Sequence, residues 1–98
     1  MRLLFALAVL FAACHDHDHD GYSTFQACFD EHTMEESLTV NQAIVVCCLD
    51  HPIDGVSDVC GATASTCVDY LTANLGAASA TDAERTAACD EYVVQRGM

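Results

Sequence analysis

Seven cysteines in a chain of 98 residues constrain this fold more than any other feature of the sequence. So high a proportion is typical of exported proteins, whose cysteines pair as disulfides, and is rare in cytosolic ones. Cys14 directly follows an apolar stretch and is treated separately below. An even number then remains, which allows three bridges: Cys28, Cys47, Cys48, Cys60, Cys67 and Cys89.

Residues 1–13 have the pattern of a secretory signal peptide. Arg2 precedes an unbroken apolar run from Leu3 to Ala13, which matches a short basic region followed by a hydrophobic one. A membrane-spanning helix needs about 20 apolar residues, and His15 interrupts this run too soon. We therefore predict an exported chain with three parts: a signal peptide at 1–13, a tether at 14–22 and a folded domain at 23–98.

The residues before the first cysteine, Leu10-Phe11-Ala12-Ala13-Cys14, resemble the lipobox of bacterial lipoproteins. The resemblance covers only the first fourteen residues and implies location, not activity. It implies lipidation of Cys14, cleavage just before it and a lipid anchor in the cell envelope. His15 in place of aspartate would direct such a protein to the outer membrane of a diderm bacterium. Cleavage after Cys14 is the alternative and would give a freely extracellular protein.

Negative charge dominates the chain after the signal peptide. Fifteen Asp and Glu residues stand against Arg85 and Arg96, with no lysine, so the side chains beyond residue 13 sum to −13 with histidine neutral. Such a surface repels phosphate backbones, which argues against a nucleic-acid partner. It also lacks the basic cluster that binds anionic lipid. Any attachment to a membrane would have to be covalent or hydrophobic, and a basic protein is a possible partner.

The segment His15-Asp16-His17-Asp18-His19-Asp20 alternates imidazoles and carboxylates. It has no apolar periodicity and is predicted to be a disordered tether. Imidazole binds Zn²⁺, Cu²⁺ and Ni²⁺, and alternate residues of an extended chain share one side, so these six residues are candidate metal ligands. The alternative is a solvated spacer, because ordering the segment costs about 1–2 kcal/mol per residue. No other part of the sequence requires a cofactor.

The rest of the chain predicts an all-α fold of four short helices. Each helix has capping residues at its start or a breaker at its end. The expected helices run from Ser23 with Gln26 to about Ser37, from Thr39 with Gln42 through Leu49, from Asp54 or Ser57 to Gly76, and from Thr81 with Glu84 onward. Pro52 excludes His51 from the second of them. On the first helix His32 is expected to be a packing residue at the core boundary, and His51 a surface residue of a turn.

Helix geometry restricts how the cysteines can pair. Cys60 and Cys67, if on one helix, lie about 10.5 Å apart along its axis, which is too far for a disulfide. Adjacent Cys47 and Cys48 point in different directions and should reach different partners. Residues at equal distance from a turn face each other in a helical hairpin. Three pairs of cysteines have a predicted turn midway between them, and we expect these to form the bridges: Cys28–Cys47, Cys48–Cys60 and Cys67–Cys89. The alternative exchanges Cys47 and Cys48.

No catalytic motif is present. The sequence has no G-x-S-x-G, no glycine-rich phosphate loop and no H-E-x-x-H, and its cysteines are assigned to bridges. We therefore expect a non-enzymatic, exported and lipid-anchored binding or structural module of the cell envelope. The alternatives are extracytoplasmic capture of a divalent metal by the tether and a freely secreted, disulfide-rich effector that binds a basic partner.

Overall fold

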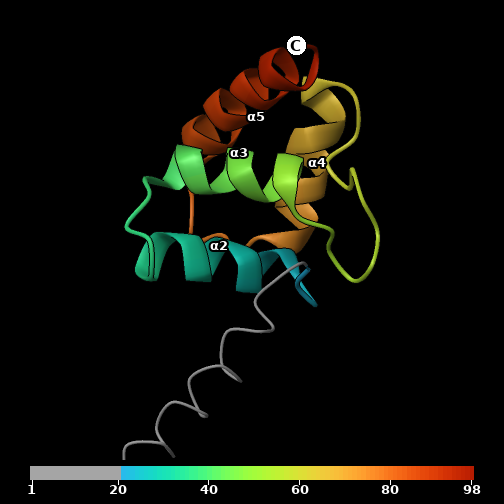
Figure 1. The fold of residues 1–98 in the computed structure, drawn as a ribbon. Helices are drawn as coiled ribbons and strands as arrows, with labels where there is room; N and C mark the ends of the chain where they lie inside the picture. The colour runs from blue at the N-terminus through green and yellow to red at the C-terminus, as the bar shows by residue number, and fades with distance from the viewer. Residues whose placement is uncertain (1–20) are drawn as a thin grey trace, which may run out of the picture.

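The computed structural model describes residues 21–98, which form an all-helical domain (Figure 1). Four helices follow one another along the chain: α2 at Phe25–Met34, α3 at Val40–Asp50, α4 at Ala64–Asn74 and α5 at Asp82–Arg96. The predicted fold class is therefore confirmed. The signal peptide, Cys14 and the tether residues His15 to Asp20 lie outside the described residues. Within residues 21–98 no helix has the length and apolar character needed to cross a membrane.

Local capping chemistry sets most of the helix starts. Thr39 with Gln42 begins α3 and Thr81 with Glu84 begins α5, each as a reciprocal capping box in which side chain and backbone N–H satisfy each other. The start of α2 differs by one residue from the prediction, because Thr24 rather than Ser23 accepts the hydrogen bond from the N–H of Ala27. These caps satisfy backbone donors that a helix leaves unpaired in its first turn.

The prediction for the third helix was wrong at its start. The helix α4 begins only at Ala64, after Thr63 as N-cap, and residues 51–63 form a loop. Asp54 and Asp58 have φ values of 53° and 59°, outside the range of a right-handed helix. A Cβ on Gly61, whose φ is 83°, would lie 2.4 Å from the Thr66 hydroxyl. The spacing from Val56 to Cys67 is that of a helix face, but the positive φ values of Asp58 and Gly61 break the helix within it.

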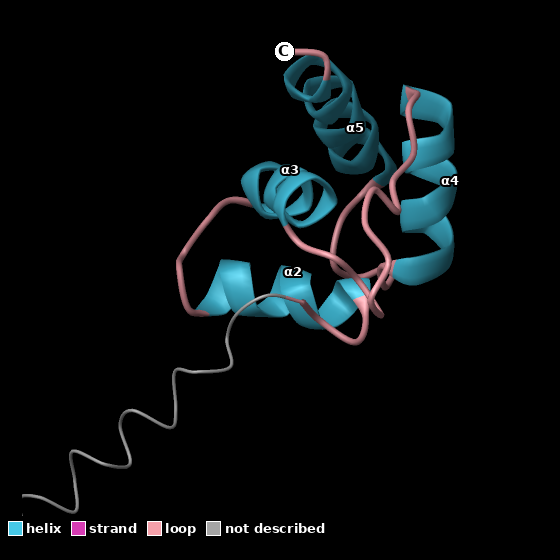
Figure 2. Cartoon of the chain, turned by 45° about the vertical axis from the view of Figure 1, so that its right-hand side comes forward, coloured by secondary structure: helices cyan, strands magenta, loops and turns pink. Residues whose placement is uncertain are grey.

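The helices pack as a chain of neighbours around one core. The helix α3 packs against both α2 and α5, and α5 packs against α4. Figure 2 looks almost along α3 while α2 lies across the view, so these two helices cross at a wide angle instead of forming an antiparallel hairpin. The largest side chains that are fully buried in the core belong to all four helices: Tyr92, Phe25, Ile44 and Leu71.

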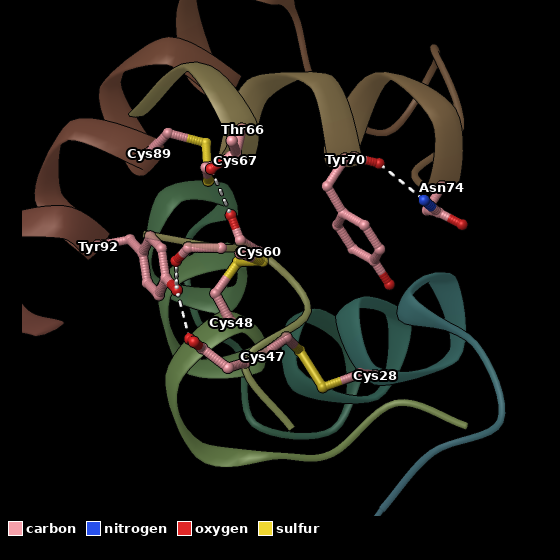
Figure 3. The surroundings of a disulfide bond; sticks show 12 residues. Cys28, Cys47, Cys48, Cys60, Thr66, Cys67, Tyr70, Asn74, Cys89 and Tyr92 are labelled. Atoms are coloured by element: carbon pink, nitrogen blue, oxygen red, sulfur yellow. Dashed lines mark hydrogen bonds between the residues drawn. A yellow bond between two sulfur atoms is a disulfide. The ribbon is translucent and has the colours of Figure 1, made fainter. Parts of the chain in front are cut away.

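Three disulfides run in succession through this core (Figure 3). They join Cys28 to Cys47, Cys48 to Cys60 and Cys67 to Cys89, which are the pairs predicted from the sequence. All six cysteines are buried. The expectation that each bridge joins consecutive helices is wrong for the second one, because Cys60 lies in the loop and not in α4. That bridge fastens the loop to α3. Buried disulfides of this kind indicate an oxidising environment outside the cytosol.

Candidate functional site

Two imidazole rings meet where the loop leaves α3. His32, on the inner face of α2, is 5% exposed, and His51, directly after α3, is half-buried. Their Nε2 atoms lie 3.2 Å apart and the two rings are nearly parallel, with an interplanar angle of 29°. One Nε2 can donate a proton to the other, or both can offer a lone pair to a third atom. The prediction that His51 is only turn surface is therefore wrong, whereas the prediction that His32 packs at the core boundary is confirmed.

The chain positions both rings through ordinary helix chemistry. His32 continues the buried face of α2 formed by Phe25, Cys28 and Phe29. His51 adopts an extended backbone, with φ −124° and ψ 134°, because the following Pro52 excludes the helical region. The side chain of His51 therefore turns away from the course of α3, toward α2.

A carboxylate and an aromatic ring complete the surroundings of the pair. Glu36 Oε1 lies 3.0 Å from His32 Nδ1, at an angle that falls short of a directed hydrogen bond. The Glu36 side chain is half-exposed, so a small rotation would align the contact. The ring of Tyr22 packs edge-on against both imidazoles, with centroids 6.2 Å from His32 and 5.2 Å from His51. Tyr22 itself is fixed by backbone hydrogen bonds to Pro52 and Asp54.

Two groups of side chains among residues 21–98 have the composition of a metal site. The first comprises Cys28, His32 and His51, whose ligand atoms lie within 4.8 Å of one another, and the second Cys48, Cys60 and Cys67. Every cysteine in them belongs to a disulfide and has no thiolate to offer. The second group therefore has no metal ligand left. The first keeps two imidazoles.

A different polar cluster joins the middle of the loop to α5. Arg96 donates two hydrogen bonds to the Asp58 carboxylate, from Nε at 3.1 Å and from a terminal nitrogen at 2.7 Å. The Tyr92 hydroxyl, on a fully buried ring, lies 3.0 Å from the same carboxylate and also donates to the carbonyl of Gly61. We refer to Asp58, Tyr92 and Arg96 as the clasp. Each polar group in it has a partner, so the clasp has the character of a structural contact.

Electrostatics within the clasp follow from these contacts. The hydrogen bonds from Arg96 and then from Tyr92 hold the pKa of the Asp58 carboxyl below its usual value. Burial and the neighbouring Asp58 raise the pKa of the Tyr92 hydroxyl. The pKa of Arg96 is raised by the same carboxylate. At neutral pH these three shifts favour an ionised Asp58, a neutral Tyr92 hydroxyl and a protonated Arg96, which are the states that form the hydrogen bonds of the clasp.

The surface also has an open hollow between α3 and α5. Apolar side chains of Val45, Val46 and Ala87 line it together with amides and one acid: Asn41, Gln42, Gln95 and Glu91. Its volume is 540 Å³, within the range of small-molecule sites. A single exposed carboxylate beside amides gives it no nucleophile and no acid–base pair. These residues could contact a bound molecule, but they offer no groups for catalysis.

Among the predicted site residues, the structure brings together the six cysteines of the three disulfides. The metal candidates of the tether, His15 to Asp20, and the lipidation site Cys14 lie outside the described residues. The sequence-based reasoning missed the pairing of His32 with His51. The sequence carried no signal for it, because His32 and His51 each follow a cysteine of the predicted Cys28–Cys47 bridge by four positions and would diverge in an antiparallel hairpin.

Comparison with known proteins adds no assignment. No protein-family model, no curated protein and no solved structure matches this chain.

Proposed function

We propose that the protein is an exported, lipid-anchored module of the cell envelope, in which a rigid helical domain stands clear of the membrane on the His/Asp tether. The observation that carries this proposal is the burial of three disulfides in so small a core. Each bridge contributes about 2–4 kcal/mol, while the core of a domain of this size rarely contributes more than about 3–5 kcal/mol. A fold that depends on bridges to this extent is suited to an oxidising compartment.

Anchoring is supported by the lipobox-like residues that end at Cys14 and by the acidity of the chain. A chain with a charge of −13 beyond its predicted signal is repelled by anionic headgroups. A covalent acyl chain therefore suits it better than electrostatic adhesion. A second acyl chain would be needed for stable anchoring, since a single one binds only reversibly.

The intact mass of the purified protein, before and after reduction, tests this proposal. We expect a chain that begins at Cys14, carries the mass of acyl chains and gains six hydrogen atoms on reduction. Labelled fatty acid should be incorporated into the wild type and not into Cys14→Ser. An unmodified chain that begins after Cys14, with no label incorporated, would overturn the anchor and favour a freely secreted effector with a basic partner.

A second candidate function is capture of a divalent metal through the tether. It is favoured by the last residue of the tether, Tyr22, which packs against two further imidazoles in the domain. Calorimetry with Zn²⁺, Cu²⁺ and Ni²⁺ would compare the wild type with a variant carrying His15→Ala, His17→Ala and His19→Ala. Equal affinity and stoichiometry in the two proteins would remove the tether from the account of metal binding.

A further inference from the structure

We propose that His32 and His51 together form a binding site for a single Zn²⁺, Cu²⁺ or Ni²⁺ ion, located in the folded domain and independent of the tether. Each residue would contribute its Nε2 atom, and water would fill the remaining positions. The site does not depend on lipidation of the chain or on the ligands His15 to Asp20.

The distance between the two nitrogens supports this site. Zinc binds imidazole nitrogen at about 2.0–2.1 Å in tetrahedral geometry, which places two such nitrogens about 3.3 Å apart. The Nε2 atoms of His32 and His51 are 3.2 Å apart before any ion is present. The two nitrogens are therefore already separated by the distance that a shared ion needs. A change in ring orientation, to which His51 as the more exposed of the two is better suited, would direct both lone pairs at the ion.

The surroundings of His32 match those of a metal-bound imidazole. Ligating histidines usually donate their second ring N–H to a carboxylate, which fixes the tautomer and strengthens the ligand. Glu36 Oε1 lies 3.0 Å from Nδ1 of His32 and is the group that would play this part. With the proton of His32 on Nδ1, its Nε2 carries the lone pair that a metal needs. Nδ1 is buried and lacks a well-aligned partner, so binding that draws Glu36 into line would also satisfy this atom.

Proton balance is simple for a neutral pair. In the metal-free state the short contact requires a proton on one of the two Nε2 atoms, and with His32 protonated on Nδ1 that proton belongs to His51. Binding shifts that proton of His51 to Nδ1 through exchange with solvent, so both Nε2 atoms become ligands and no net proton is released. The choice of metal follows from the ligand type. Imidazole nitrogen binds Cu²⁺ more tightly than Ni²⁺ or Zn²⁺.

The neighbouring sulfur does not add a ligand. Cys28 Sγ lies within 4.8 Å of the imidazole nitrogens, but it is bonded to Cys47. The site therefore has two protein ligands, and water or an external group would have to supply the others. Sites of this kind bind more weakly than closed structural zinc sites, which have four protein ligands. The negative charge of the domain raises the local concentration of cations and partly offsets this weakness.

The chain allows a clean test, because it has five histidines and three of them lie in the tether. In protein purified from an oxidising compartment and carrying His15→Ala, His17→Ala and His19→Ala, only His32 and His51 remain. Titration of this variant with Zn²⁺ or Cu²⁺ should show one ion per chain, and bound Cu²⁺ should show hyperfine coupling to two imidazole nitrogens. Further substitution of His51→Ala should weaken binding by at least about tenfold. His51 is chosen because His32 is part of the buried core.

Two matched variants keep the result interpretable. Glu36→Gln should weaken binding by about tenfold through loss of the carboxylate beside His32. Glu35→Gln removes the adjacent exposed acid, which has no ion pair with the described residues, and should leave binding unchanged. Circular dichroism would check that each variant remains folded. Absence of a bound ion in the tether variant, or equal affinity with and without His51, would overturn the proposal whatever the outcome of the lipidation experiment.

Discussion

The loop at residues 51–63 is fastened to the helices at both ends, and the two fastenings differ in kind. Near its C-terminal end, Cys60 is covalently bound to α3 and Asp58 is held by the clasp residues Tyr92 and Arg96 of α5. At its N-terminal end, the side chain of His51 meets His32 of α2 through two ring nitrogens, and the backbone of Pro52 and Asp54 is hydrogen-bonded to Tyr22.

The difference lies in how completely the polar groups are satisfied. In the clasp, the carboxylate, the guanidinium and the buried hydroxyl all have hydrogen-bond partners within the protein. In the imidazole pair, a single shared proton separates two atoms that could each serve as a ligand, and His32 Nδ1 remains poorly paired. A fully satisfied cluster stabilises the fold and has no capacity left for a ligand, whereas an incompletely satisfied one keeps that capacity. Substitutions and ligands that act at one end of the loop or the other test this contrast.

Loss of the second bridge should have the largest effect. Replacement of Cys48→Ala together with Cys60→Ala frees the loop in the unfolded chain and should lower the free energy of unfolding by about 2–4 kcal/mol. Urea unfolding followed by circular dichroism measures it. An unchanged midpoint would mean that the clasp alone holds this end of the loop. Treating the wild type with reductant should remove all three bridges and unfold the domain.

Metal binding should act at the opposite end of the loop. A ligand that binds only the folded state at a free concentration of 100 times Kd stabilises it by about 2.7 kcal/mol. Zn²⁺ at that concentration should raise the thermal midpoint of the variant with the tether histidines replaced by alanine. It should leave the midpoint unchanged once His51→Ala is added. A rise of equal size in both proteins would place the ion elsewhere.

The buried hydroxyl of the clasp should have an effect of intermediate size. Tyr92→Phe keeps the ring but leaves the carbonyl of Gly61 without its donor, which costs about 1–3 kcal/mol in a buried setting. Tyr70→Phe is the matched control, because the Tyr70 ring packs edge-on against Phe25 and its hydroxyl makes no hydrogen bond to the described residues. Chemical denaturation should show a clear loss for the first and little change for the second. Equal losses of stability in the two variants would show that the hydrogen bonds of the Tyr92 hydroxyl do not stabilise the fold.

Acid should weaken the clasp selectively. The pKa of Asp58 is held below its ordinary value in the folded state by Arg96 and Tyr92, so its ionised form stabilises the fold. That contribution is present above about pH 4, the usual pKa of an unfolded aspartate, and disappears as the pH falls through the folded-state pKa. A plot of unfolding midpoint against pH should be flatter for Asp58→Asn than for the wild type.

The control for that measurement is Asp54→Asn. Asp54 also has a positive φ, 53°, and its carboxylate has no ion-pair partner among the described residues. Asparagine tolerates this backbone conformation as well as aspartate does. The Asp54 variant should therefore follow the acid profile of the wild type. If it flattened the profile to the same extent as Asp58→Asn, the effect would belong to net charge and not to the clasp.

Local and covalent features of this protein were decided by the sequence itself. The reciprocal caps at Thr39 and Thr81 form from residues three positions apart, so they depend on no distant contact. The all-α fold and the end of α3 before Pro52 follow for the same reason. The three bridges could also be predicted, because six cysteines on four short segments leave few pairings that geometry permits.

The conformation of the loop and the meeting of the two imidazoles depend on how distant segments pack against each other. The loop at 51–63 has a helix-like apolar spacing, and only its bridge to α3 and its positive φ values at Asp54, Asp58 and two glycines exclude a helix there. The meeting of His32 and His51 requires α2 and α3 to cross at a wide angle. That angle is set by how side chains interdigitate across the whole core, and no local run of residues encodes it.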